Sequence, residues 1–179
     1  LLVIRLVVIG FAGGDEVIDD DLCAVHEIAE LGCNYRITDI QCALGLSQLS
    51  RLAEWVSRRQ EIARRYDEAL IDVSSVKPLH CSPDGSHAYH LYVVQVDSSG
   101  CGMSRAEVFS ALRNEGIGVN VHYIPVHLHP YYQERFGCRP GDCPVAEAAY
   151  ERMLSLPMFP AMTDDDIADV IEALKKVVG

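Results

Sequence analysis

Residues 34–41, Asn-Tyr-Arg-Ile-Thr-Asp-Ile-Gln, open the strongest helix that the sequence predicts. Thr38 and Gln41 have the spacing of a capping box, in which each side chain satisfies an open backbone donor at the helix start. Apolar residues then recur at helical spacing as far as about Leu70. We therefore predict one long helix over residues 38–70, and helices of this length often connect two domains.

After this helix the sequence alternates between strand and helix patterns. A connector over residues 71–86 is followed by the order strand, helix, strand, helix, helix, strand, helix, which is typical of a compact α+β domain. One helix has a second capping box, formed by Ser104 with Glu107, and Thr163 caps the last helix. The predicted strands cover 88–96, 119–124 and 156–159, and the predicted helices begin at Ser104, Pro130, Pro144 and Thr163.

The chain begins with a β-branched apolar run over residues 1–12 that predicts a strand without obvious partners. Its first residue is Leu1 rather than methionine, which suggests a truncated or processed chain. The run is interrupted by Arg5 and is too short to span a bilayer, so we expect no membrane attachment. We expect the first forty residues to be the tail of something larger.

The amino-acid composition narrows the range of functions that the chain could have. The formal net charge of -11 disfavours binding to a phosphate backbone, so we expect no nucleic-acid partner. Seven cysteines without a C-x-x-C pair fit reduced thiols in a cytoplasmic protein. His87 with His90, and His127 with His129, have ligand-like spacing, but no cysteine pair accompanies them and we predict no metal site.

Asn34, Tyr35 and Arg36 form the first candidate site, in the turn before the long helix. Amide, phenol and guanidinium groups at a helix start suit a phosphate, and arginine offers a two-donor fork. The same residues also fit an ordinary turn in which Asn34 adopts the turn conformation and Arg36 pairs with a carboxylate. The residues alone leave both interpretations open.

The second candidate site is the segment over residues 121–132, which contains three histidines and three tyrosines. Such a density of hydrogen-bonding and stacking groups suits a base or a sugar. The alternative is a half-buried strand end whose aromatic side chains fill the core. A sequence does not show whether these groups converge on a pocket.

Several ordered blocks resemble one family. Residues 32–49, which include the opening stretch, closely resemble the start of the C-terminal region in DegT/DnrJ/StrS-type sugar aminotransferases. Residues 58–66, 116–127 and 154–160 continue the likeness, so that it covers about residues 31–178. Several matching blocks in order are more specific than one short motif.

The resemblance implies an α/β enzyme with the aspartate-aminotransferase type of fold, known as fold type I, in which pyridoxal 5'-phosphate is the cofactor. This chain would be a C-terminal fragment of it. Residues 1–37 would be a remnant of the large cofactor domain, 38–70 a long linking helix, and 71–179 the small C-terminal α+β domain. Homodimers of the family share residues between the two sites.

The resemblance also implies residue roles. Asn34 would contact the cofactor phosphate of the partner subunit, and Tyr35 and Arg36 would help to position cofactor or nucleotide-sugar phosphate. His122, Tyr123 and His127 would line the sugar-nucleotide pocket. The sequence of residues 122–128 most resembles that of transaminases that act on UDP-linked 4-keto-6-deoxy-N-acetylhexosamines in pseudaminic acid biosynthesis. These use glutamate as the amino donor and give a UDP-4-amino-4,6-dideoxy-N-acetyl-altrosamine type of product.

The chemistry of this family needs a lysine that forms a Schiff base with the cofactor. The chain has only Lys77, Lys175 and Lys176, and none lies in the family's lysine setting, which we expect upstream of residue 1. We therefore predict an aminotransferase parent and a chain that is inactive alone. The alternatives are a non-catalytic dimerisation or sugar-nucleotide-binding module, and a dehydrating family member in which histidine replaces the lysine.

Overall fold

The computed structural model describes residues 37–82 and 85–179. The chain divides into two units, Leu1–Leu49 and Ser50–Gly179, and each is described by itself. The strand predicted over residues 1–12 lies outside the described residues. Of the elements described, the second unit contains the three-stranded sheet and every helix except the first.

Helix α1, Asp39–Leu49, is the described part of the first unit together with the two residues before it. The predicted capping box is confirmed, because the Thr38 N–H donates to Gln41 Oε1 at 2.9 Å and the Gln41 N–H donates to Thr38 Oγ1 at 3.3 Å. None of the residues of α1 is buried, and Ile40 is 82% exposed. The helix therefore forms from local signals rather than from an apolar face packed in a core.

The single helix predicted over 38–70 is wrong in its continuity. Helix α2, Leu52–Leu70, starts anew after a turn at Ser50 and Arg51, and the ψ of Arg51 is -4°. The apolar spacing continues across the turn and no proline or glycine marks it, so periodicity alone does not reveal the interruption. The second helix buries one face made of Ile62, Ala63, Tyr66 and Leu70.

Three short antiparallel strands form one sheet in the order β1-β2-β3. Central strand β2, Tyr92–Val96, lies within the strand predicted over 88–96 and buries alternate residues. Strand β1, Val76–Pro78, lies in the predicted connector, and β3 is Met153–Leu156 rather than 156–159. Both outer strands are defined by pairing with distant residues of β2, which local patterns do not encode.

The remaining elements follow their local signals closely. Both expected N-caps form capping boxes, Ser104 with Glu107 and Thr163 with Asp166. The strand predicted over 119–124 is wrong, because the only pairing described in this range is an isolated bridge between Asn120 and Ser155. The remaining described elements are α3 (Ser98–Cys101), α4 (Arg105–Asn114), the 3-10 helix η1 (Val126–Leu128), α5 (Pro130–Phe136), α6 (Pro144–Tyr150) and α7 (Asp164–Val178).

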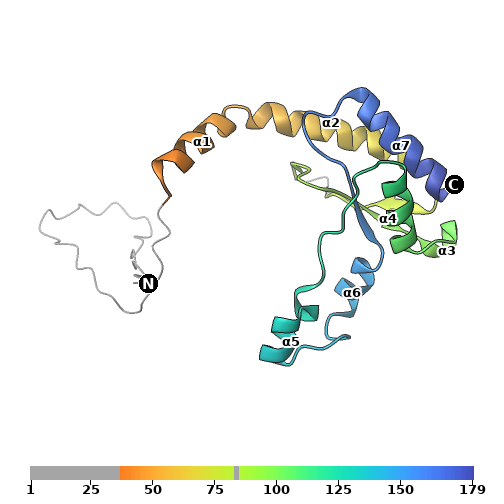
Figure 1. The fold of residues 1–179 in the computed structure, drawn as a ribbon. Coiled ribbons are helices and arrows are strands. Elements are labelled where there is room, and N and C mark those ends of the chain that lie inside the picture. The colour runs from red at the N-terminus through yellow and green to blue at the C-terminus, as the bar shows by residue number, and fades with distance from the viewer. Residues whose placement is uncertain (1–36, 83–84) are drawn as a thin grey trace, which may run out of the picture. The chain divides into compact units, whose positions relative to one another are not determined.

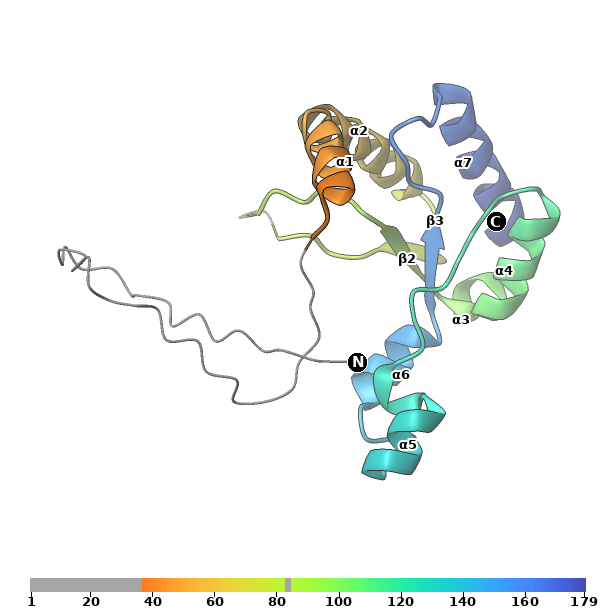
Figure 2. The same cartoon turned by 60° about the vertical axis from the view of Figure 1, so that its left-hand side comes forward.

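Helices α2, α4 and α7 pack with the sheet around one hydrophobic core (Figure 1). Helices α5 and α6 lie together at the other end of the sheet, as both Figure 1 and Figure 2 show. The most fully buried side chains come from α2, β1, β2, α4, β3 and α7. They include Ile62, Tyr66, Val94, Val108, Leu112, Leu154, Ile167 and Leu174.

Ion pairs join the middle of α2 to the start of α7. Arg58 contacts Glu61 at 2.7 Å and Asp164 at 3.0 Å, and Arg65 contacts Glu61 at 3.1 Å and Asp164 at 3.0 Å. The hydrogen bonds from Arg65 and then Arg58 lower the pKa of Asp164. Because these carboxylates are largely solvated, the network fixes the arrangement of two helices more than it stabilises the fold.

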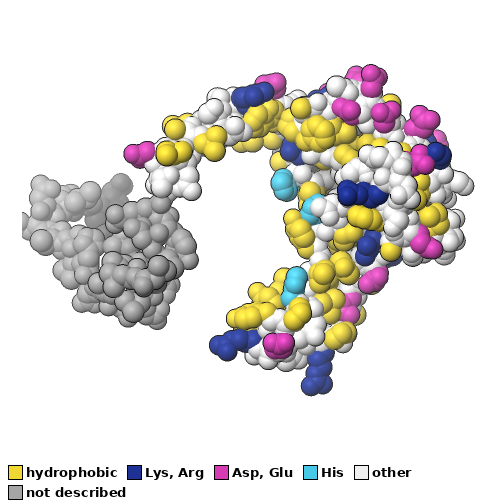
Figure 3. Space-filling model, in the orientation of Figure 1, with side chains coloured by type: hydrophobic (Ala, Val, Ile, Leu, Met, Phe, Trp, Pro, Cys, Tyr) yellow, Lys and Arg dark blue, Asp and Glu magenta, His cyan; other side chains and the backbone are white. Residues whose placement is uncertain are grey.

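The surface of the second unit is uneven in charge and hydrophobicity. Acidic side chains gather over α7, while hydrophobic side chains are exposed over α5 and α6 (Figure 3). Those of Tyr131, Phe136 and Val145 are 61%, 64% and 83% exposed. No helix within residues 37–82 and 85–179 is long and apolar enough to cross a membrane.

Candidate functional site

The first predicted site, Asn34, Tyr35 and Arg36, lies outside the described residues. Its proposed contact with a cofactor phosphate therefore stays a prediction. The second predicted site lies between α4 and α6 and is described completely. Two of its three histidines, His122 and His127, are held by specific partners on distant elements, which the sequence did not reveal.

His122 is fixed against the sheet by a side chain of β3. Its Nδ1 lies 2.8 Å from the Oγ of Ser155, which is only 4% exposed. The backbones of Asn120 and Ser155 exchange hydrogen bonds of 3.1 and 2.8 Å beside this contact. Tyr123 is 72% exposed, and its ring meets that of His122 edge-on. The segment thus combines a fixed imidazole with an accessible phenol.

His127 is held by an acidic residue twenty positions later. Its Nε2 lies 2.8 Å from Glu147 Oε1, and the His127 side chain is only 11% exposed. The same carboxylate accepts hydrogen bonds from the backbone N–H groups of Gly141, at 2.8 Å, and Cys143, at 3.3 Å. Glu147 therefore connects η1, the loop before α6 and α6 itself.

This arrangement determines which nitrogen of His127 carries hydrogen. An ionised carboxylate only accepts hydrogen bonds, so Nε2 must donate to Glu147. In the neutral imidazole, Nδ1 is then the acceptor, as suits a hydroxyl of a ligand. The donors around Glu147, first His127 and then the Gly141 N–H, lower the pKa of its carboxyl group.

We expect the Glu147 contacts to make the fold sensitive to acid. The folded pKa of Glu147 lies below its unfolded value, so its contribution is complete above about pH 4.3 and is lost as the pH falls through the folded value. Urea unfolding at pH 7 and pH 3 should show a larger acid loss of stability in the wild type than in Glu147→Gln. Glu134→Gln, on exposed α5, serves as the control and should behave like the wild type. Equal acid losses in wild type and Glu147→Gln would contradict this role.

Two cavities lie elsewhere in the second unit. One of about 630 Å³ is formed by the start of α2 and by residues 159–161. The other, of about 550 Å³, is formed by β1, β2 and their connection and includes His80, His87 and Tyr89. Neither of these two cavities is lined by His122, Tyr123 or His127.

The histidine pairs that suggested a metal do not assemble into a cluster. In the described part of the chain, no group of three or more histidine, cysteine, aspartate or glutamate side chains could hold a metal ion. His87 Nδ1 instead accepts a hydrogen bond from the Tyr89 N–H at 2.9 Å. His127 is occupied by Glu147, as described above.

The lysines do not fit a covalently bound pyridoxal phosphate. All three lie in the described part of the chain. Lys77 is exposed on β1 opposite Gln95, Lys176 contacts Glu115 at 2.7 Å, and Lys175 is exposed in the last turn of α7. No lysine lines either cavity. The residues present therefore do not supply the amine that this cofactor chemistry requires.

Comparison with known sequences gives a match over almost the whole chain. The profile of the DegT/DnrJ/EryC1/StrS aminotransferase family matches residues 5–175. The spore coat polysaccharide biosynthesis protein SpsC of Bacillus subtilis is 47% identical over 154 residues, which are 86% of this chain and 40% of that protein. Protein MJ1066 of Methanocaldococcus jannaschii is 40% identical over the same shares of the two chains.

Solved structures agree with the sequence comparison. PseC of Helicobacter pylori, an aminotransferase involved in pseudoaminic acid biosynthesis, matches with a TM-score of 0.75 and 28% identity, over 87% of this chain and 41% of its own. The putative sugar aminotransferase Spr1654 of Streptococcus pneumoniae in its PMP form matches with a TM-score of 0.76 and 30% identity, over 86% and 38%.

The predicted fold class is thereby confirmed, since the chain matches part of fold-type I sugar aminotransferases whose cofactor is pyridoxal phosphate. Spr1654 has been solved in both PLP and PMP forms. The chain spans about 40% of the length of the relatives that it matches. It belongs to the DegT/DnrJ/EryC1/StrS aminotransferase family.

Proposed function

We propose that this chain forms part of an aminotransferase that acts on a nucleotide-linked 4-keto-6-deoxy sugar with pyridoxal phosphate as cofactor. The observation that carries the proposal is the family match over residues 5–175. The chain is similar to PseC, an aminotransferase involved in pseudoaminic acid biosynthesis, and the proposed substrate is a UDP-linked N-acetylhexosamine that gives a 4-amino-4,6-dideoxy-altrosamine type of product. Glutamate is the proposed amino donor, and the proposed setting is a cytoplasmic homodimer with shared sites.

Within that enzyme we assign substrate contacts to residues 122–127. The anchoring of His122 by Ser155 and of His127 by Glu147 supports this assignment, because a binding site needs fixed polar groups. Tyr123 adds an exposed phenol that suits a hydroxyl or phosphate oxygen. We assign Asn34, Tyr35 and Arg36 to the cofactor and nucleotide phosphates of a partner subunit.

The proposal requires a lysine from outside this chain. The amine of that lysine would carry the cofactor and move the proton in the reaction, whereas residues 122–127 would bind and orient the sugar nucleotide. Lys77, Lys175 and Lys176 line neither of the two cavities. Sugar-nucleotide binding without catalysis, the function of a binding module, is therefore the second candidate for the chain alone.

The chain incubated alone with pyridoxal phosphate should form no specific lysine adduct. After borohydride treatment, mass spectrometry should find no stoichiometric modification at any one lysine, and the visible absorbance of a bound cofactor should be absent. The triple variant Lys77→Arg, Lys175→Arg, Lys176→Arg gives the background for non-specific reaction. A single lysine modified stoichiometrically in the wild type and protected by UDP would overturn the requirement for an outside lysine.

Binding of UDP tests the assigned substrate contacts directly. Calorimetry should detect saturable binding by the wild-type chain, and His127→Gln and Tyr123→Phe should each weaken it by about 3- to 10-fold, the loss of one hydrogen bond. Tyr150→Phe, on α6 and outside residues 121–132, is the matched control. Unchanged affinity in both site variants would rule out this segment as the nucleotide contact.

A further inference from the structure

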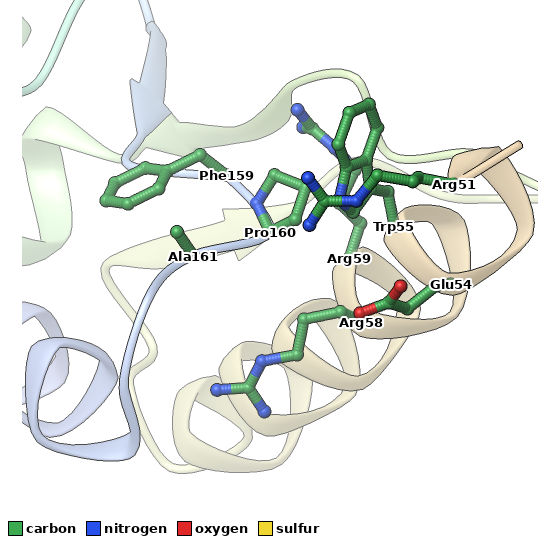
Figure 4. A pocket seen from close by; sticks show the side chains of 8 residues that line it. All are labelled: Arg51, Glu54, Trp55, Arg58, Arg59, Phe159, Pro160 and Ala161. Atoms are coloured by element: carbon green, nitrogen blue, oxygen red, sulfur yellow. The ribbon is translucent and has the colours of Figure 1, made fainter. Parts of the chain in front are cut away.

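The cavity at the start of α2 has an unusual lining for so acidic a chain. Three arginines, Arg51, Arg58 and Arg59, line it beside an apolar wall (Figure 4). The formal net charge of the chain is -11, so a local excess of cations needs a reason. The other lining residues are Glu54, Trp55, Phe159, Pro160 and Ala161.

The three arginines differ in how their charges are balanced. Arg58 is neutralised by Glu61 at 2.7 Å and by Asp164 at 3.0 Å. Arg51 and Arg59 form no ion pair with any carboxylate in residues 37–82 and 85–179. Two uncompensated guanidinium groups therefore border the same cavity.

Both of these guanidinium groups are held in place. One nitrogen of Arg59, Nη1, donates to the backbone carbonyls of Tyr89, His90 and Met158 at 3.0 to 3.1 Å. These neutral acceptors fix the side chain and leave its charge uncancelled. The Arg51 guanidinium lies over the ring of Trp55, 4.8 Å from its centroid. Binding of an anion here would thus order little that is not already ordered.

The walls of the cavity add an apolar surface to the two charges. Phe159 is 47% exposed, and Figure 4 shows Pro160 between Phe159 and the stacked pair of Arg51 and Trp55. Guanidinium forks match phosphate oxygens, and apolar walls suit the remainder of an organic ligand. We propose that this cavity binds a phosphate ester with a ring, its phosphate facing Arg51 and Arg59 and its ring facing the apolar wall. This site is separate from the sugar-binding segment proposed above.

The chain carries its own optical probe for this site, because Trp55 is its only tryptophan. Phenyl phosphate is the ligand to use, since it has the proposed chemistry and no role in amino transfer. Titration should change the Trp55 fluorescence in a saturable way. Inorganic phosphate should bind more weakly and phenol more weakly still, and raising the ionic strength should weaken binding of phenyl phosphate.

Two variants that change the charge of the cavity lining in opposite directions make the test specific. Arg51→Gln should weaken binding of phenyl phosphate by about 5-fold, and Glu54→Gln, which removes the one acidic lining residue, should tighten it by about 2-fold. Arg64→Gln, on the same helix but outside the cavity, is the control and should bind like the wild type. Because Arg51 and Glu54 are both exposed, circular dichroism should show intact folding in all three variants.

Two results would overturn the site. One is the absence of saturable binding of phenyl phosphate by the wild-type chain. The other is equal affinity in wild type, Arg51→Gln and Glu54→Gln. Tyr123→Phe should bind phenyl phosphate normally, so failure of this proposal is distinguishable from failure of the proposed UDP contacts. A phenol affinity equal to that of phenyl phosphate would show an apolar pocket only and would also refute the phosphate site.

Discussion

Replacement of Tyr66 by alanine should destabilise the second unit by about 4 kcal/mol, within the usual range for removing a large buried aromatic side chain. Tyr66 on α2 is 0% exposed. Its ring packs against that of Tyr92 with centroids 4.9 Å apart, and its hydroxyl donates to the Pro157 carbonyl at 2.9 Å. The substitution therefore removes a helix-to-sheet contact, leaves a cavity and strands a carbonyl group.

Urea unfolding followed by circular dichroism measures this change, and two further variants separate its parts. Tyr66→Phe keeps the ring and loses only the hydroxyl bond, so it should cost about 1 kcal/mol. Tyr131→Ala removes a tyrosine that is 61% exposed and should change stability by less than about 1 kcal/mol. If Tyr66→Ala lost less stability than Tyr66→Phe, the core would not depend on this ring.

Replacement of Arg59 by methionine should destabilise the same unit by about 2 to 3 kcal/mol, since a charged donor is lost and two of its three acceptors, on Tyr89 and Met158, are half-buried. Arg59 Nη1 bonds the carbonyls of Tyr89 and His90, before β2, and of Met158, after β3. One side chain thus joins two segments that are far apart in sequence. Without it, both segments lose a shared hydrogen-bond donor.

Unfolding measurements on a short series of variants test this role. Arg59→Lys keeps a charge but has no planar fork, so it should recover only part of the lost stability. Arg64→Met removes an exposed arginine whose pair with Glu68 is one helical turn away, and it should have an effect within about 0.5 kcal/mol. Full recovery by Arg59→Lys would mean that charge, rather than the three-carbonyl geometry, matters.

Helix starts were predicted well because their causes are local. Each capping box depends on two side chains three residues apart, and the pairs beginning at Thr38, Ser104 and Thr163 all form. Gly137 likewise ends α5 with a φ of 70°, a conformation that glycine adopts without strain. The sequence over a few residues suffices in each case.

Strands and site partners were predicted less well because their causes are distant. The position of β3 depends on pairing with β2, about sixty residues earlier in the chain. The histidine segment was found from its composition, but Ser155 and Glu147 were not, since nothing near them in sequence indicates a histidine partner. The three-carbonyl role of Arg59 was equally hidden among neighbouring arginines that form ordinary ion pairs.

The two rims of the small sheet also have a consequence for behaviour at high concentration. Strand β1 offers an incoming strand only three residues, of which Lys77 is charged and Pro78 lacks an N–H. At the opposite rim, Asn120 already takes both backbone groups of Ser155. Recruitment of further strands into fibrils needs a long row of free donors and acceptors. Neither rim provides one, so this sheet is a poor seed for amyloid growth.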